Sequence, residues 1–304
     1  MAIDRDQLYG VRREEDLADG LSRAAAGRAE KALERLRGID AGEADTAEAV
    51  HGARKDMKKL RTVLRLLRGR LPKRVYREQN RRFRDAARAL SATRDAEVKL
   101  GTLAALVEAD GELPRATVES WRRILESERE AATNAARDEP AIAAAAVEIE
   151  AGLEAIEAWP LAGDSWRLVG DGLERAYRRG RRAMHAAAVE GEEAAFHEWR
   201  KRAKDLWYAL RLLEAAWPQV LAPSAEEAHR LSELLGDHHD LAVLREDLHG
   251  RRLGEKESRA LEAAIDTREA ELAAAAFDLG ARLYAERPQV FARRLRGYWR
   301  AWRG

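Results

Sequence analysis

The amino-acid sequence predicts an all-α protein made of two similar helical bundles, and three observations support this prediction. The 304 residues are 36% charged and include only 7 Pro, with long runs of Ala, Leu, Glu and Arg, which favour helices. Apolar residues recur every three or four positions along most of the chain, as in amphipathic helices. One 18-residue stretch also occurs twice, 146 positions apart, which indicates two related halves.

The repeated stretch reads VHGARKDMKKLRTVLRLL at residues 50–67 and FHEWRKRAKDLWYALRLL at residues 196–213. The alignment pairs one histidine, four basic residues and four leucines: His51 with His197, Arg54 with Arg200, Lys55 with Lys201, Lys58 with Lys204, Arg65 with Arg211, Leu60 with Leu206, Leu64 with Leu210, Leu66 with Leu212 and Leu67 with Leu213.

Each copy has a basic face and an apolar face when drawn as a helix. The basic faces carry His51, Arg54, Lys55, Lys58, Thr62 and Arg65 in the first copy and His197, Arg200, Lys201, Lys204, Tyr208 and Arg211 in the second. Like charges at such spacing destabilise a helix by about 0.2–0.5 kcal/mol per pair. A merely solvated face usually mixes signs, so the recurrence of a nearly acid-free face favours an anionic ligand.

The first half contains six expected helices. They cover about residues 15–37, ending at Gly38; 44–68; 73–90; a stretch that ends near Asp110; and two acidic segments between 114 and 159, separated near Pro140. The third of these carries a second basic stripe, Arg77, Arg81, Arg84 and Arg88. The SATRD stretch at 91–95 has the composition of a turn followed by a helix start.

The second half begins after the PLAGD stretch at 160–164, where Pro and Gly favour a boundary. We expect helices at about 165–189, over the second repeat up to Trp217, beyond Pro223, from about Glu255, and from Pro288. The predicted organisation is therefore a lead-in at 1–14, a first repeat at 15–160 and a second at 161–304.

Composition excludes several classes of protein. The chain has no Cys, so disulfides and thiolate metal sites are absent. No apolar run approaches the roughly 20 residues of a membrane span, and the N-terminus lacks a signal pattern, so we expect a cytoplasmic protein. The net charge of +1 hides a strong asymmetry, since residues 51–94 carry 16 Lys and Arg against 3 acids. Such a segment attracts polyanions.

The paired motifs resemble the CHAD family, whose name refers to a conserved histidine α-helical domain. Its His-x-x-Arg-Lys/Arg-x-x-Lys/Arg signature is similar to His51, Arg54, Lys55, Lys58, Lys59, Leu60 and Arg61, and to His197, Arg200, Lys201, Lys204, Leu206 and Tyr208. Its later turn is similar to Thr93, Arg94 and Asp95 in one half and to Leu235, Gly236, Asp240 and Leu241 in the other. The resemblance spans roughly residues 15–300.

The resemblance implies one two-lobed unit, with pseudo-symmetric bundles around a basic central groove or cavity that binds inorganic polyphosphate, in some members on polyphosphate granules. The second half departs from the first, because Asp205 and Trp207 replace Lys59 and Arg61. Some relatives carry an attached hydrolase with a Glu-x-Glu-x-Lys strand. The nearest strings here, at 148–150 and 255–257, lack the Lys, so we expect no such domain.

The expected polyphosphate contacts are cations and their neighbours on the two repeated faces: His51, Arg54, Lys55, Lys58, Arg61, Arg65, His197, Arg200, Lys201, Lys204, Tyr208 and Arg211. A second tier comprises Arg28, Arg81, Arg84, Arg88, Arg178, Arg181 and Arg182. Nearby phosphate stabilises the imidazolium, so we expect the pKa values of the two histidines to rise on binding.

No metal, cofactor or catalysis is expected. Asp95 and Asp240 are better explained as a helix cap or as partners of an Arg than as metal ligands or bases. The side chains of His238, His239 and Asp240 diverge by about 100° per residue on a helix and converge poorly on one ion. A nucleic-acid-binding helical protein remains an alternative, as does an enzyme acting on phosphoanhydrides. The basic faces, however, offer few aromatics for base stacking and few acids for Mg²⁺.

Overall fold

The computed structural model describes residues 9–42, 44–90, 95–110, 113–135, 139–251 and 255–304. Within these residues the chain forms helices and no strand: α1 (Leu17–Asp40), α2 (Thr46–Leu66), α3 (Lys73–Ala89), α4 (Asp95–Ala109), α5 (Arg115–Ala135), α6 (Glu139–Glu157), α7 (Arg167–Glu190), α8 (Glu193–Leu213), the short 3-10 helix η1 (Glu214–Ala216), α9 (Pro218–His249), α10 (Glu255–Leu283) and α11 (Pro288–Arg303). The all-α prediction is confirmed. The predicted turn at 91–94 lies outside the described residues.

The helix ends follow from local chemistry. The Asp45 side chain accepts a hydrogen bond from the Glu48 backbone N–H at 2.9 Å and caps α2. Gly191 ends α7 with a φ of 66°, a left-handed conformation that costs glycine little. Pro218 and Pro288 occupy the first turns of α9 and α11, where the missing N–H costs no hydrogen bond.

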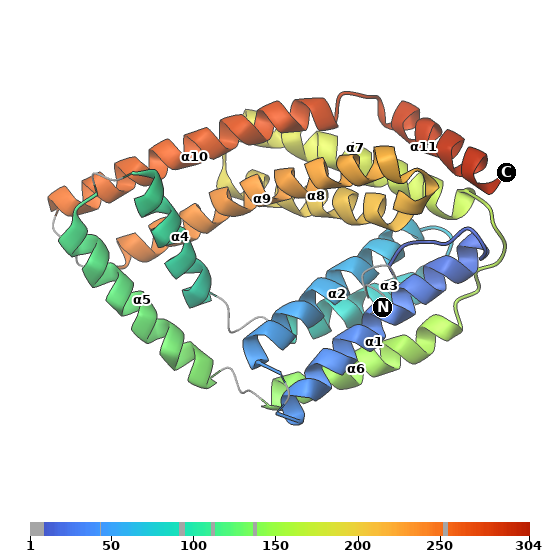
Figure 1. Ribbon diagram of the computed structural model, residues 1–304, viewed down its shortest axis with the longest axis horizontal. Coiled ribbons are helices and arrows are strands. Elements are labelled where there is room, and N and C mark those ends of the chain that lie inside the picture. Colours follow the sequence, from blue (N-terminus) through green and yellow to red (C-terminus); the bar gives the residue numbers. More distant parts are fainter. Residues whose placement is uncertain (1–8, 43, 91–94, 111–112, 136–138, 252–254) are drawn as a thin grey trace.

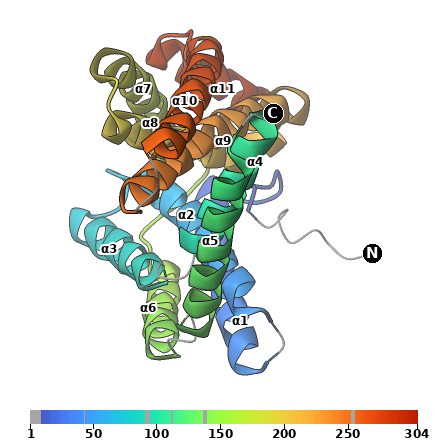
Figure 2. The same cartoon turned by 90° about the vertical axis from the view of Figure 1, so that its left-hand side faces the viewer.

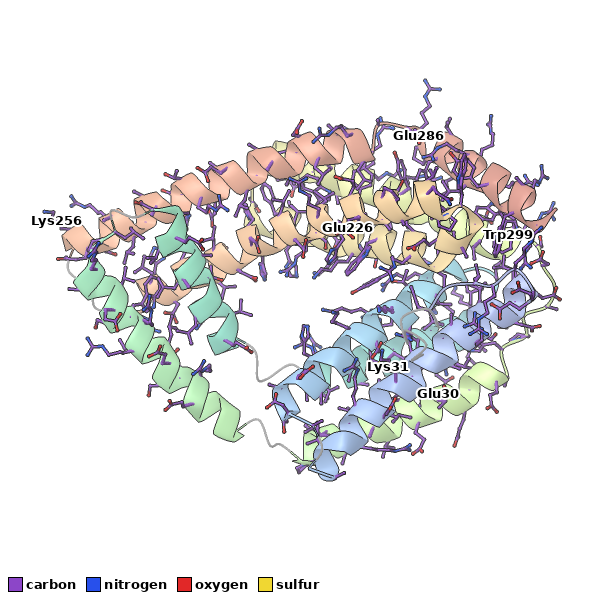
Figure 3. All side chains as sticks on the ribbon, viewed as in Figure 1. Glu30, Lys31, Glu226, Lys256, Glu286 and Trp299 are labelled. Atoms are coloured by element: carbon purple, nitrogen blue, oxygen red, sulfur yellow. The ribbon has the colours of Figure 1, made fainter. Side chains whose placement is uncertain are left out.

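Two helical bundles make up most of the molecule (Figure 1). In the first bundle α1 packs against α2 and α6, and α3 packs against α2 and α6. In the second bundle α8 lies between α7 and α9, while α10 packs along α9 and α11 packs on α7. Lys256, near the start of α10, and Trp299, in α11, lie at opposite ends of the long axis (Figure 3).

The α4–α5 pair leaves the first bundle and packs on the second. Leu103, Leu106, Val118 and Trp121 form a separate core with α9 and α10 residues such as Leu244, Leu261 and Ile265. Lys99 Nζ lies 2.8 Å from Asp247 Oδ1, and Trp121 Nε1 donates to Asp247 Oδ2 at 2.8 Å. Figure 2 shows the pair extending from α9 and α10 toward α1 and α6. Packing therefore crosses the division that we expected near residue 160.

The two bundles meet where α2 approaches α7 and α8. The contact is close, because a Cβ built on Gly172 of α7 would lie 2.2 Å from the Leu66 carbonyl oxygen of α2. Alongside it, Arg70 pairs with Asp171, and the Val11 N–H donates to the Leu212 carbonyl at 3.0 Å. From this junction the bundles diverge toward the side that α4 and α5 close (Figure 1).

No helix among the described residues combines the length and the apolar character that a membrane crossing requires.

Candidate anion-binding site

The repeated basic helices are amphipathic as predicted. On α2, the side chains of Ala53, Met57, Leu60 and Leu64 are fully buried, and on α8 those of Trp199, Ala203, Leu206 and Leu210 are at most 1% exposed. Burial of these stripes, at about 25 cal/mol per Å² of apolar surface, holds each helix in its bundle. The opposite faces are therefore directed away from the core of each bundle.

The basic faces reach the surface to different extents. Lys55 and Lys201, which are equivalent in the repeat, are exposed. The other predicted cations and both histidines are half-buried: His51, Arg54, Lys58, Arg61, Arg65, His197, Arg200, Lys204 and Arg211. Arg211 Nε lies 3.2 Å from Glu214 Oε2, so an acid of η1, directly after α8, already neutralises this cation.

Tyr208 does not lie on the accessible basic face. Its side chain is 3% exposed, and its ring stacks on that of Trp207 with centroids 4.5 Å apart. The expectation that Tyr208 contacts a ligand is therefore corrected. The equivalent residue of the first repeat, Thr62, is also buried. Helical spacing could not show this, because the junction between the bundles covers this part of the face.

Arg28 is also corrected as a candidate ligand contact. Its side chain is 0% exposed, and Nη1 lies 3.2 Å from Asp56 Oδ1. Arg35 Nε lies 3.2 Å from the other oxygen of the same carboxylate. Burial raises the pKa of Asp56, and Arg28 opposes this effect. The three residues form a structural ion network between α1 and α2, and Arg28 is inaccessible to a ligand.

Asp205 connects the basic clusters of the two bundles. Its Oδ1 lies 2.6 Å from Arg65 Nη2 of α2, and its Oδ2 lies 2.6 Å from Arg202 Nη1 of α8. Burial and the charge of Arg65 lower the pKa of the neighbouring Arg61 to about 10. The replacement of Lys59 by Asp205 in the second repeat thus places one acid among the arginines where the bundles meet.

The arginines of α7 that line the junction are not the ones predicted from the sequence. Arg175 and Arg179 of α7, with Arg65, Arg68, Tyr76 and Asp205, line a cavity of about 40 Å³. Arg178 pairs with Glu174, and Arg181 Nη1 donates to the Glu286 carbonyl at 3.1 Å, so these two second-tier candidates have local partners on α7 and beside α11. Arg182 is exposed. Sequence could not distinguish the stripes, because Arg occupies both.

The cavity at the junction is too small to be the polyphosphate-binding cavity that the family resemblance implied. Its volume of about 40 Å³ is close to that of one or two water molecules, so a phosphate chain would not fit inside it. The cations beside it instead extend onto α3, where Arg81, Arg84 and Arg88 are exposed as expected. Arg61 Nε donates to Asn80 Oδ1 at 3.2 Å, which joins the α2 face to α3.

The Gly and Asp of the later motif hold an arginine. Arg200 Nη1 lies 3.6 Å from Asp240 Oδ1, and a Cβ on Gly236 would lie 3.0 Å from Arg200 Nη2. Glycine therefore leaves room for the guanidinium beside α9, and the aspartate one turn later pairs with it. The expectation that Asp240 is the partner of an Arg is confirmed. The side chain of Asp95 lies outside what the structure describes.

The same arrangement occurs in the first bundle with other residues. A Cβ on Gly52 would lie 2.5 Å from Arg35 Nη1, and Arg35 pairs with Asp56, four residues after Gly52. In both bundles, then, an arginine from a neighbouring helix crosses a glycine and pairs with the aspartate one turn further on.

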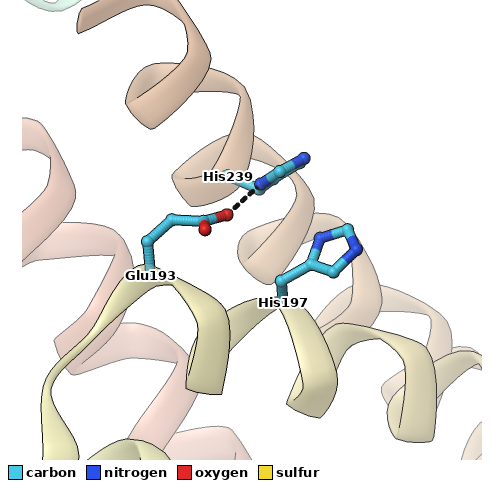
Figure 4. A group of neighbouring side chains, drawn as sticks. All are labelled: Glu193, His197 and His239. Carbon is cyan, nitrogen blue, oxygen red and sulfur yellow. Dashed lines mark hydrogen bonds and ion pairs between the residues drawn. The ribbon is translucent and has the colours of Figure 1, made fainter. Parts of the chain in front are cut away.

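His197 lies beside His239 and Glu193 at the start of α8 (Figure 4). The two imidazole centroids are 4.4 Å apart, and His239 Nδ1 contacts Glu193 Oε1. Burial, with the charges of Lys201 and His239, lowers the pKa of His197 to about 4, so its imidazole is neutral at pH 7. Sequence reasoning missed Glu193, although it stands four residues before His197.

His238, His239 and Asp240 diverge as expected. His238 is 8% exposed and stacks on Phe196 with centroids 4.2 Å apart, whereas His239 approaches His197 and Asp240 approaches Arg200. The three consecutive side chains thus have three separate environments and do not converge on one ion.

The fold and the site define a class of protein: an all-α chain of two packed bundles, each with a helix whose basic face bears a histidine. The CHAD domain family model matches residues 27–249, and the chain belongs to this family. The family predicted from the motifs is confirmed.

Two solved structures share the fold. PptA from Streptomyces chartreusis has a TM-score of 0.63 and 15% sequence identity, over 90% of this chain and 100% of that chain. The CHAD domain from the plant Ricinus communis has a TM-score of 0.50 and 20% identity, over 99% and 97%. The comparison with curated proteins finds no match.

Proposed function

We propose that this protein binds inorganic polyphosphate without catalysis, on the cationic surface of α2, α3, α7 and α8. The observation that carries the proposal is the meeting of arginines from both bundles at one junction, where Arg65 of the α2 basic face and Arg202 of α8 share Asp205. Three exposed cations of this surface have no ion-pair partner in the described part of the chain: Lys55, Lys201 and Arg81. Membership of the CHAD family supports the same ligand.

The residue types suit a phosphate chain. Each phosphate unit carries about one negative charge and no side chain to recognise. Arg forks make bidentate contacts with phosphate, and Lys acts as a mobile point charge. Binding releases counterions, so affinity falls as salt rises. Location on polyphosphate granules would follow from this affinity.

The first test is calorimetric titration of long-chain polyphosphate at two salt concentrations. The variant Lys55→Ala/Lys201→Ala removes two exposed, equivalent cations from the basic faces. Arg115→Ala/Arg287→Ala is the matched control, because it removes two exposed cations from α5 and from the segment before α11. Arg200 is a less suitable target, since its loss would also disturb its contacts with Gly236 and Asp240.

We expect the Lys55→Ala/Lys201→Ala variant to bind at least 10-fold more weakly at low salt and to show a shallower salt dependence, while the control changes little. Absence of binding by the natural protein at low salt would refute the function. Equal weakening of both variants would refute the site and leave only a general effect of net charge.

Affinity should rise as pH falls from 8 to 6. In the unbound protein the pKa of His197 is about 4, so this imidazole holds no proton in that range. Adjacent phosphate raises the pKa of the histidine, and the complex then takes up a proton that the unbound protein does not. Titrations at fixed salt measure the effect, and His197→Gln should reduce it. Equal affinities at the two pH values would contradict the role of the histidine.

Competition separates polyphosphate from nucleic acid. Base stacking needs exposed aromatic rings among the cations, and Tyr208, which lies in the basic stripe of α8, is buried. We expect long-chain polyphosphate to displace single-stranded nucleic acid, and not the reverse. Release of phosphate from polyphosphate in the presence of Mg²⁺ would instead favour an enzyme and contradict the non-catalytic part of the proposal.

A further inference from the structure

We propose that Glu193, His197 and His239 form a binding site for a divalent transition-metal ion, with Zn²⁺ as the best match. One potential ligand atom of each residue lies within 4.8 Å of those of the other two. Imidazole nitrogen and carboxylate oxygen together are a donor set that Zn²⁺ prefers. This site shares His197 with the proposed polyphosphate surface, but its argument does not depend on polyphosphate binding.

Two helices position the three donors. Glu193 and His197 are four residues apart on α8, so they share one face of the helix. His239 comes from α9, which packs along α8. Figure 4 shows the three side chains directed toward the same space between these helices. Of the consecutive residues His238, His239 and Asp240, only His239 belongs to the proposed site, because the other two side chains point elsewhere.

The distances allow coordination after a small adjustment. Tetrahedral bonds of about 2.0–2.2 Å place neighbouring ligand atoms about 3.3 Å apart. In the structure without a metal ion, the three ligand atoms lie within 4.8 Å of one another, so they would move slightly closer on binding. Glu193 is exposed, so its carboxylate can rotate without disturbing the core. His239 Nδ1 and Glu193 Oε1 are already in contact.

An unsatisfied nitrogen supports the site. His197 Nδ1 is buried and has no hydrogen-bond partner among the residues that the structure describes, although buried polar atoms are usually paired. A metal ion between the two rings would satisfy a nitrogen of this kind.

The surrounding charges make this a site of limited affinity with an open position. Lys201 and Arg200 are close enough to His197 to contribute to its low pKa, and they oppose a cation. Glu193 supplies the negative charge, and it interacts electrostatically with Glu269 of α10. Three protein donors leave a fourth position for water, as in zinc sites that are not closed by the protein.

The test is titration of the chelator-treated protein with Zn²⁺ by calorimetry and with Co²⁺ by visible absorption, in buffer without phosphate. We expect one ion per chain and a Co²⁺ spectrum of tetrahedral or five-coordinate type. The variants Glu193→Gln and His239→Ala should each weaken binding by at least 10-fold. His229→Ala is the matched control, since this histidine also lies on α9 next to acids, Glu226 and Glu233, but outside the cluster.

Either of two results would overturn the proposal: no stoichiometric binding by the natural protein, or binding that survives Glu193→Gln and His239→Ala. Circular dichroism checks that the variants are folded, and Glu193→Gln is the safer of the two because it changes an exposed residue without changing its size. Polyphosphate itself chelates metal ions, so the affinity of the protein for polyphosphate is measured separately, on chelator-treated protein without added metal. Loss of one binding activity with retention of the other then identifies which proposal fails.

Discussion

At the residue scale, the arginines of this protein have two roles that composition does not separate. Arg28 is fully buried against Asp56, whereas Arg81, Arg84 and Arg88 are exposed on α3. A buried charge needs its partner, because an unpaired ion in the interior carries a desolvation penalty of several kcal/mol. An exposed cation has no such requirement, because water solvates it; Arg84, for example, pairs with the exposed Asp85 at the surface. The difference predicts a large loss of stability when a buried arginine is replaced and a small one when an exposed arginine is replaced.

Arg28→Met should destabilise the fold by about 3–5 kcal/mol, because it removes the buried partner of the Asp56 carboxylate and leaves that carboxylate to the less buried Arg35 and to the charges of Lys59 and Lys31. Urea unfolding at pH 7 measures the change. The control is Arg37→Ala, which removes an exposed ion pair with Glu150 and should cost at most about 1 kcal/mol. A similar cost for both substitutions would show that the buried network is not required for stability.

At the scale of elements, the α4–α5 pair has the most distinctive position. It leaves the bundle formed by its sequence neighbours and shares a separate core with α9 and α10. Trp121 is the largest member of that core, with 0% exposure and a hydrogen bond from Nε1 to Asp247. Lys99 and Arg251 converge on the same carboxylate, and their hydrogen bonds lower the pKa of Asp247 despite its burial. This pair of helices should therefore unfold locally if the core is damaged.

Trp121→Ala should cost about 3–5 kcal/mol of local stability, because it removes a large buried side chain and leaves a cavity. We expect faster hydrogen exchange over 95–135 and over the facing ends of α9 and α10, with α1, α2 and α6 protected as before. The control substitution, Trp217→Ala, changes a tryptophan that is 44% exposed. Uniformly faster exchange throughout the chain would mean that the second core does not unfold as a unit.

At the scale of the whole molecule, one close contact determines how the two bundles meet. Gly172 of α7 lies against the backbone of Leu66 at the end of α2, and Arg65 reaches Asp205 beside it. A side chain at position 172 would collide with backbone, which cannot move aside as a flexible side chain could. The relative position of the basic faces thus depends on the absence of a Cβ at this residue.

Gly172→Ala should destabilise the protein by about 1–3 kcal/mol through overpacking, and it should weaken polyphosphate binding by moving α2 away from α7. Gly101→Ala is the control, because a Cβ there would meet no atom of the described residues within 4 Å, and alanine favours a helix by about 0.5–1 kcal/mol. Thermal unfolding and the polyphosphate titration measure both effects. Unchanged stability and affinity in Gly172→Ala would show that the junction tolerates a shift.

Much of the fold could be predicted from sequence, because helix formation depends on local patterns. The apolar stripe of Met57, Leu60 and Leu64 indicated a buried face, and Pro288 marked a helix start. The predicted start of α9 was wrong, because this helix begins at Pro218 and continues through Pro223, beyond which we expected it to begin. The 146-residue repeat also brought out the two histidine-bearing helices and the CHAD family. Such features require only neighbours within one or two helical turns.

The candidate site could be predicted only in part, because a helical spacing shows which residues share a face and not what covers that face. Arg28 and Tyr208 fit the basic stripes in sequence but are buried in the folded chain. Conversely, Arg175, Arg179 and Arg202 reach the junction through tertiary packing alone. Glu193 joins His239 for the same reason, since they come from different helices.

The sequence by itself therefore determined the helices, their amphipathic faces and the segregation of charge, all of which follow from residue type and periodicity. Only the tertiary structure decided that α4 and α5 pack on the opposite bundle, that Asp205 sits between Arg65 and Arg202, and that His197 and His239 meet. The physical reason is that long-range contacts depend on shape and burial between distant segments, and no local pattern encodes those.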